Sequence, residues 1–317
     1  MNLKKNRINP LVVVFSISFA LSVGLLVFAV SKGLTGFSTS SLESSEHQLL
    51  SFDGLGNIGV LNLEGVISES IPTLEVLKEF EENKRIKAVI IRVDSPGGAV
   101  GPSQEIFDQI KKLRQKGKIV VASLGSVAAS GGYYVACAAD KIVSAAGTLT
   151  GSIGVIMHLS NLEEFYNWIK IKPYTIKSGK FKDLGATNRA MTPEERSYLQ
   201  SLIDSTHMQF QKAVAEGRGL PLEFVKTFAD GRIMNGEMAH SFQLVDQLGN
   251  FQDAVDLAAK EAGIKKPKLV YPKDKKIFDW REMFGAMIKT GVKSLQEIKV
   301  IPQNFNSSGL NYLWDRP

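Results

Sequence analysis

The sequence predicts an α/β protein whose mostly parallel sheet is built from βαβ units. From residue 58 onward, short apolar runs rich in β-branched residues alternate with segments of helical spacing. Strands separated by helices pair in parallel through right-handed crossovers. No internal repeat is visible, which argues against solenoids and propellers. A hydrophobic fraction of 44% and a charged fraction of 22% are typical of a globular core.

The expected elements follow one another along the chain. Strands are predicted at 58–62 and 66–67, on either side of Gly65, and then at 88–93, 118–123 and 141–143. Helices are predicted at 103–113, 133–139, 193–211 and 222–229. We expect the chemistry to lie in loops that leave the carboxyl ends of the strands.

The N-terminus carries a candidate membrane anchor. Residues 11–30 are uncharged and apolar, long enough to cross about 30 Å of hydrocarbon as a helix. Lysine and arginine in residues 1–10 predict, by the positive-inside rule, that this end is cytoplasmic. A cleaved signal peptide is the alternative, but the run exceeds the roughly 7–15 apolar residues of a removable segment. We therefore expect a retained anchor, followed by a Ser-rich tether over 31–50.

Charge and cysteine content exclude several classes. The net charge of +6 lies largely near the two ends of the chain and forms no central stripe, which argues against a nucleic-acid partner. Cys137 is the single cysteine, so neither an intrachain disulfide nor a thiolate metal cluster can form. Its neighbours are small and apolar, and we expect it to pack in the core.

The segment DSPGG, residues 94–98, directly follows a predicted strand. Proline and two glycines favour a tight turn, and the absent Cβ atoms leave backbone N–H groups open to a ligand. Two such donors aimed at one point form an oxyanion hole. Taken alone, the segment is better explained as a plain strand-to-helix turn.

Ser130 stands among alanines and glycines in SVAASGGYY, residues 126–134, between a predicted strand and helix. Its small neighbours leave the hydroxyl accessible, and a helix N-terminus favours developing negative charge. The N–H of Gly131, one residue later, is a candidate oxyanion donor, as in other strand–turn–helix nucleophiles. The alternative is that Ser130 only caps the helix.

Lys182 lies in SGKFKD, residues 178–183. A lysine of ordinary pKa near 10.4 holds only about 0.04% free amine at pH 7, too little for a general base. Burial that lowers such a pKa by about 3 units would be needed. Phe181 and Tyr174 are candidates for the apolar surroundings, and a solvated surface lysine is the alternative.

Together the motifs resemble the signal peptide peptidase A family, membrane-anchored Ser–Lys peptidases, in its short single-domain form. The resemblance spans residues 59–249 and rests on DSPGG, VAASGGYY, TLTGSIGVIM, TIKSGKFKD and GRIMNGEMA…LVDQLG in this order. It implies a Clp-protease/crotonase-like fold. It also implies, as substrates, cleaved signal peptides and other membrane or extracytoplasmic peptides. The reaction it implies requires no cofactor and no metal.

By position, the resemblance implies Ser130 as nucleophile, Lys182 as general base and Ser152 as the hydroxyl that orients the lysine. Gly98 and Gly131 match the donors of the oxyanion hole. The resemblance further implies a homo-oligomeric ring, an octamer in relatives of this kind. In those relatives the serine and the lysine of one site come from neighbouring subunits.

The expected organisation combines these elements. It comprises a cytoplasmic N-terminus (1–10), a transmembrane anchor (11–30), a flexible tether (31–50), a Ser–Lys peptidase domain (51–262) and a basic, amphipathic tail (263–317). The anchor places the domain on the extracytoplasmic, periplasmic side of the inner cell membrane. The tail carries no family motif and is either a membrane-surface helix, a subunit-packing segment or an ordinary surface helix.

Three other functions are compatible with the same predicted fold. A Clp-type Ser-His-Asp peptidase would use His158 as base, oriented by Asp183 or Asp94. A non-peptidase crotonase-like enzyme would use the glycine N–H groups on a thioester enolate, although such thioesters are cytoplasmic and the anchor argues against them. An inactive scaffold is the third, but nothing at Ser130 or Lys182 suggests decay.

Overall fold

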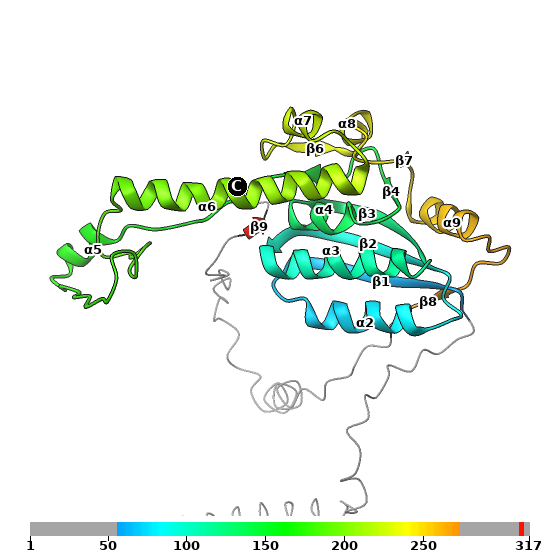
Figure 1. The fold of residues 1–317 in the computed structure, drawn as a ribbon, viewed down its shortest axis with the longest axis horizontal. Helices are drawn as coiled ribbons and strands as arrows, with labels where there is room; N and C mark the ends of the chain where they lie inside the picture. The colour runs from blue at the N-terminus through cyan, green and yellow to red at the C-terminus, as the bar shows by residue number, and fades with distance from the viewer. Residues whose placement is uncertain (1–55, 273–310, 314–317) are drawn as a thin grey trace, which may run out of the picture. The chain divides into compact units, whose positions relative to one another are not determined.

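The computed structural model describes residues 56–272 together with the strand at 311–313. Within these residues a nine-stranded sheet runs in the order β6-β5-β3-β2-β1-β8, with β4, β7 and β9 paired off this path (Figure 1). The strands are β1 (Ile58–Ile67), β2 (Ala88–Ala99), β3 (Ile119–Ala129), β4 (Lys141–Ser144), β5 (Leu149–Gly151), β6 (Ile233–Asn235), β7 (Gln247–Leu248), β8 (Leu269–Val270) and β9 (Asn311–Leu313).

Helices connect the strands and cover the sheet. They are α2 (Ile71–Glu82), α3 (Val100–Gln115), α4 (Gly131–Ala136), α5 (Glu163–Trp168), α6 (Pro193–Arg218), α7 (Leu222–Lys226), α8 (Gly236–Ser241) and α9 (Phe251–Glu261). The parallel pairs β1–β2 and β2–β3 are joined through α2 and α3. These crossovers confirm the predicted βαβ units and the α/β fold class.

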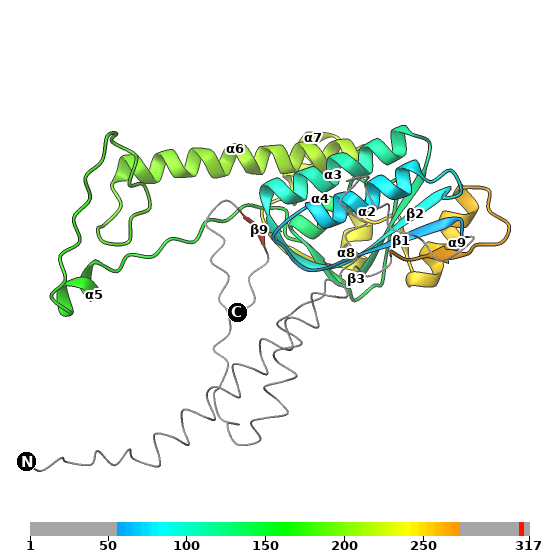
Figure 2. The ribbon, with the colours of Figure 1, turned by 90° about the horizontal axis from the view of Figure 1, so that it is seen from below.

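Two hydrophobic layers hold the sheet. Alternate residues of β2 point to opposite faces. Ile91 therefore packs with α2, α3, α4 and α6 in the larger core, whereas Ile90 packs against α9 on the other face. Figure 2 shows α2, α3 and α4 on one side of the sheet, and α9 packs on the other face, against β2, β3 and β4.

β2 and β3 both extend beyond their predicted ends, β2 to Ala99 and β3 to Ala129. The turn expected at 94–98 is wrong, because β2 continues through these residues to Ala99. Gly97 and Gly98 pair with Val66 and Ile67 of β1, so ladder hydrogen bonds override the local preference of proline and glycine for a turn. A glycine is required at 98, where an added Cβ would lie 2.1 Å from the carbonyl oxygen of Ile67.

A second difference is an arm, residues 156–192, that extends away from the sheet beside the N-terminal half of α6. Both views place α5 and its flanking segments beyond the sheet (Figures 1 and 2). The capping box of Thr192 and Glu195 begins α6 where the arm ends. The arm contains Lys182, so its position decides what the site can do.

The anchor, the tether and most of the tail lie outside the described residues. Among the helices within 56–272, none combines the length and the apolar character that a membrane crossing requires. β8 and β9 lie in 263–317, the segment that the sequence separates from the domain, and they pair with β1 and β2.

Candidate active site

The ends of three neighbouring strands bring most of the candidate residues together. β3 pairs in parallel with β5, and Ala129 lies opposite Gly151. The next residue on each strand is therefore a serine, Ser130 on one and Ser152 on the other. The N–H of Ser130 donates to the Gly151 carbonyl oxygen at 2.8 Å, which fixes the two strand ends to one another.

Ser130 occupies a sharp turn between β3 and α4. Its φ of 53° and ψ of −118° are uncommon for a residue with a Cβ atom, and such strain gathers at functional sites. The side chain makes no capping hydrogen bond to α4, so the alternative that Ser130 serves only as a helix cap is wrong. The residue is 1% exposed. A strained serine at a strand–helix turn matches the backbone arrangement of other nucleophiles.

The two candidate oxyanion residues lie on either side of this turn. Gly131 begins α4 directly after the serine. On β2, Ser95 lies opposite Ala128 of β3, so Gly97 and Gly98 continue the sheet beyond the point where β3 ends. Sequence order and strand register thus bring both glycines to the end of β3 that carries Ser130.

The place that β3 leaves beside β2 is taken by β9. This strand pairs antiparallel with β2, with Gly98 opposite Tyr312 and Ala99 opposite Asn311. An extended segment therefore fits against Gly97–Ala99, next to the turn that carries Ser130.

Ser152 is held by a part of the chain that the sequence reasoning did not assign. Its N–H donates to the Arg232 carbonyl oxygen at 2.8 Å, and the N–H of Gly231 donates to the Ile153 carbonyl oxygen at 3.1 Å. These residues precede β6, which pairs antiparallel with β5. The motif GRIMNGEMA, already noticed for its resemblance, was the signal that could have located this support. Ser152 itself has a φ of 51° and is largely buried.

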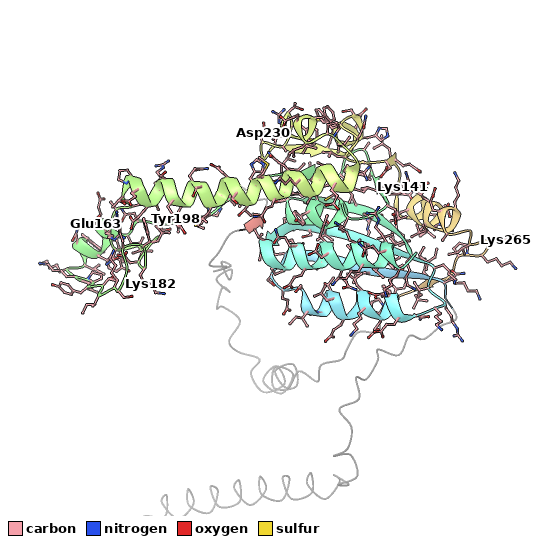
Figure 3. All side chains as sticks on the ribbon, viewed as in Figure 1. Lys141, Glu163, Lys182, Tyr198, Asp230 and Lys265 are labelled. Atoms are coloured by element: carbon pink, nitrogen blue, oxygen red, sulfur yellow. The ribbon has the colours of Figure 1, made fainter. Side chains whose placement is uncertain are left out.

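Lys182 is not brought to this cluster within one chain. It lies on the arm and is exposed, whereas Ser130 lies at the start of α4 in the core. Figure 3 shows Lys182 near Glu163 and Tyr198, beyond the sheet. A single chain therefore presents a nucleophile and a candidate base at separate places.

An ionic cluster holds the arm around Lys182. The neighbouring Asp183 binds Lys177 Nζ at 2.5 Å and Arg189 Nε at 3.1 Å. Arg189 also donates to Glu195 through Nη2 at 2.5 Å and Nη1 at 2.9 Å. The hydrogen bonds from Arg189 lower the pKa of Glu195 to about 2 and lower that of Asp183 as well. Both carboxylates stay charged at neutral pH and fix the segment from which Lys182 projects.

Within residues 56–272, the two aromatic side chains expected to surround Lys182 do not do so. Phe181 stacks on Tyr198 of α6, with ring centroids 5.3 Å apart, and Tyr174 is 88% exposed. The prediction that these two rings bury the amine is therefore wrong for the isolated subunit.

A different lysine is buried. Lys118, just before β3, is 8% exposed, and desolvation lowers its pKa. Its Nζ donates to the carbonyl oxygens of Asn83 and Ile86, both at 2.8 Å. It lies at the amino end of β3, opposite the end that carries Ser130, so we assign it a structural role.

The carboxylates considered for a Ser-His-Asp triad have other partners. Asp94 accepts the N–H of Val127 at 3.1 Å, and Asp183 binds the arm cations described above. His158 is exposed and lies on the arm, six residues after Ser152. Asp94 is therefore bonded to the backbone of β3, and Asp183 is paired with two cations of the arm.

Two family models match this chain. Residues 62–148 match the Clp protease family model, which covers the chain from the middle of β1 through β4 and includes Ser130. Residues 112–265 match the model of peptidase family S49. The fold and the strand-end site thus define an α/β peptidase domain.

Three relatives extend the comparison. A candidate protease of Synechocystis sp. is 47% identical over 196 residues, which cover 62% of this chain and 70% of that protein. A chloroplastic serine protease of Arabidopsis thaliana is 38% identical over 65% of this chain and 30% of its own length. A candidate signal peptide peptidase of Enterococcus faecium is 37% identical over 59% of this chain and 55% of its own length. The chain belongs to peptidase family S49. It spans about half or less of the length of the last two relatives.

Proposed function

We propose that this peptidase is a serine endopeptidase in which Ser130 is the nucleophile and Lys182 the general base. The observation that carries the proposal is the strained, uncapped position of Ser130 at the end of β3. The glycines at 98 and 131 flank that position on the neighbouring strand and on α4. The serine type is also that of the Arabidopsis thaliana relative.

The reaction follows from these positions. Neutral Lys182 accepts the Ser130 Oγ proton while Oγ bonds to the carbonyl carbon of the scissile peptide. The oxyanion lies against the N–H groups of Gly98 and Gly131. Lys182 then gives its proton to the leaving amine, and an acyl-enzyme remains. Water attacks the ester carbonyl, Lys182 takes the proton of that water, and Oγ recovers a proton as the acid product leaves. Ser152 orients the lysine amine.

The substrate binds as an extended peptide beside β2, in the place that β9 occupies in this structure. The pairing of β9 with Gly97–Ala99 supports this, because it places an extended backbone next to the turn of Ser130. Backbone pairing gives affinity with little demand on sequence. Following the name of the Enterococcus faecium relative, we propose residual signal peptides and other membrane or extracytoplasmic peptides as substrates.

A neighbouring subunit supplies the lysine. Lys182 lies on the arm, and the ionic cluster around Asp183 holds its segment in place. The arm also exposes apolar side chains that a partner subunit would bury: Phe165, Trp168, Ile169, Ile171, Tyr174 and Ile176. Exposed apolar surface of this extent favours association. Docking against a second copy would exclude water from the Lys182 amine and favour its uncharged form. A closed ring, octameric as in the resemblance, repeats this contact around one axis.

The chain is anchored in the inner membrane through residues 11–30, with residues 51–317 on the extracytoplasmic side. The sequence of the anchor and its basic flank support this topology. Protease added to intact spheroplasts is expected to digest the domain. Protection until the cells are lysed would reverse the orientation.

Covalent labelling tests the nucleophile. A fluorophosphonate probe is expected to label the assembled, wild-type protein at Ser130, because it reacts with an activated serine hydroxyl. Ser130→Ala should lose both label and peptidase activity. Ser241→Ala is the matched control, since this exposed hydroxyl on α8 donates to Met238 and lies away from the turn. Mass spectrometry of the labelled peptide would refute the assignment if the label persisted in Ser130→Ala.

A further inference from the structure

A bulge in β3 lies just before the nucleophile. Val93 of β2 pairs with Leu124 of β3, and the next pair is Ser95 with Ala128. One residue on β2, Asp94, therefore faces three residues on β3. A bulge of this kind bends its strand and re-aims the residues that follow.

Backbone groups at the bulge that do not pair with β2 are hydrogen-bonded by side chains instead. Arg92 Nη1 donates to the Leu124 carbonyl oxygen at 3.1 Å. Thr148 Oγ1 donates to the Gly125 carbonyl oxygen at 2.7 Å. The N–H of Val127 donates to Asp94 Oδ1 at 3.1 Å. A buried backbone group without a partner is costly, so these contacts stabilise the bulged conformation.

Asp94 holds the last residue of the bulge. Gly125 makes the contact possible, because an added Cβ there would lie 2.8 Å from Asp94 Cγ. Val127, whose N–H Asp94 accepts, is also the first of three residues paired with β5. Those three residues end at Ala129. The carboxylate therefore fixes the register of the strand segment that leads directly into Ser130.

We propose that Asp94 is a positioning residue for Ser130. It sets the distance between the Ser130 hydroxyl and the Gly98 N–H by locking the bulge of β3 to β2, an inference that rests on the proposed function. Asp94 acts as a hydrogen-bond acceptor, and its role requires neither a histidine nor a proton transfer.

Substitution of Asp94 tests this role in the full, assembled chain. Asp94→Ala is expected to lower kcat by about 10- to 100-fold, because small misplacements of reacting groups cost this much, and to leave KM nearly unchanged. Fluorophosphonate labelling of Ser130 should slow by a similar factor. Asp94→Asn should retain most of both rates, since the amide oxygen still accepts the Val127 N–H.

Asp140 provides the matched control. Its Oδ2 accepts the N–H of Val120 at 2.8 Å, at the other end of the same strand. Asp140→Ala should lower the melting temperature but leave the labelling rate of folded protein unchanged. Equal labelling rates in Asp94→Ala and Asp140→Ala would overturn the proposal, as would an Asp94→Asn variant as slow as Asp94→Ala.

Three further outcomes are decisive. Should Asp94→Ala fail to fold, Thr148→Val removes the neighbouring hydrogen bond to Gly125 and is expected to slow labelling. An unchanged rate in that variant would overturn the proposal. A wild-type chain that cleaves peptides but takes no label at Ser130 would refute the proposed function and the inference with it. A labelled wild type with unaffected Asp94→Ala refutes the inference alone.

Discussion

Replacing Lys182 by alanine or by arginine is expected to lower peptidase activity by about 100-fold or more, the usual contribution of a general base. Arginine retains the positive charge and length but does not lose its proton in a protein, so it cannot accept one from Ser130. His158→Ala should keep most of the activity. Initial rates of peptide cleavage by the assembled protein measure all three variants.

Lys180 offers a control within the same segment. It is exposed like Lys182, lies two residues away and pairs with Glu194. Lys180→Ala therefore reports the effect of removing a nearby surface charge, and we expect little loss of activity. A strong loss in His158→Ala together with an active Lys182→Ala would reverse the assignment of the base and favour a Ser-His-Asp mechanism.

Mixed assemblies are expected to recover activity from two inactive variants. Ser130→Ala and Lys182→Ala subunits are each inactive alone under the proposed mechanism. When they are mixed before assembly, about a quarter of the interfaces should pair an intact serine with an intact lysine from the next subunit. Activity should therefore approach that fraction of the wild-type value, measured as cleavage rate per subunit.

The control for this experiment places both lesions on one chain. Ser130→Ala subunits mixed with the Ser130→Ala, Lys182→Ala double variant should stay inactive, because no interface then holds an intact serine. Native mass measurement confirms that the variants have mixed. Mixed rings of the two single variants that show no activity would mean that each subunit carries its own complete dyad.

Much of the fold could be predicted because its signals are local. The strand at 88–93 is a run of β-branched residues, and the apolar spacing of 103–113 can form one buried helical face. Pairing between consecutive strands follows from the crossover rule. The prediction of Ser130 as nucleophile rests on a local signal of the same kind, since the small residues around it lie next to it in sequence.

The remaining features depend on contacts between distant segments. The turn expected at 94–98 became a strand because β1 and β9 pair with its backbone. The ammonium of Lys118 binds two carbonyl oxygens from the loop before β2. Nothing in the neighbouring sequence indicates that this lysine is buried. The separation of Lys182 from Ser130 within one chain also could not be predicted from the number of residues between their two motifs. It depends on how far α6 extends beyond the sheet and carries the arm with it.

The single cysteine has a practical consequence for locating the arm in solution. Cys137 is fully buried, its Sγ donates to the Tyr134 carbonyl oxygen at 3.1 Å, and desolvation raises its pKa to about 12. Reactive thiolate is thus nearly absent at neutral pH, and maleimides should spare the native thiol. A cysteine introduced at exposed Ile176 would then be the preferred target for a spin label. Distances between such labels on adjacent subunits of the proposed ring would measure the position of the arm directly, without removing any native residue of the core.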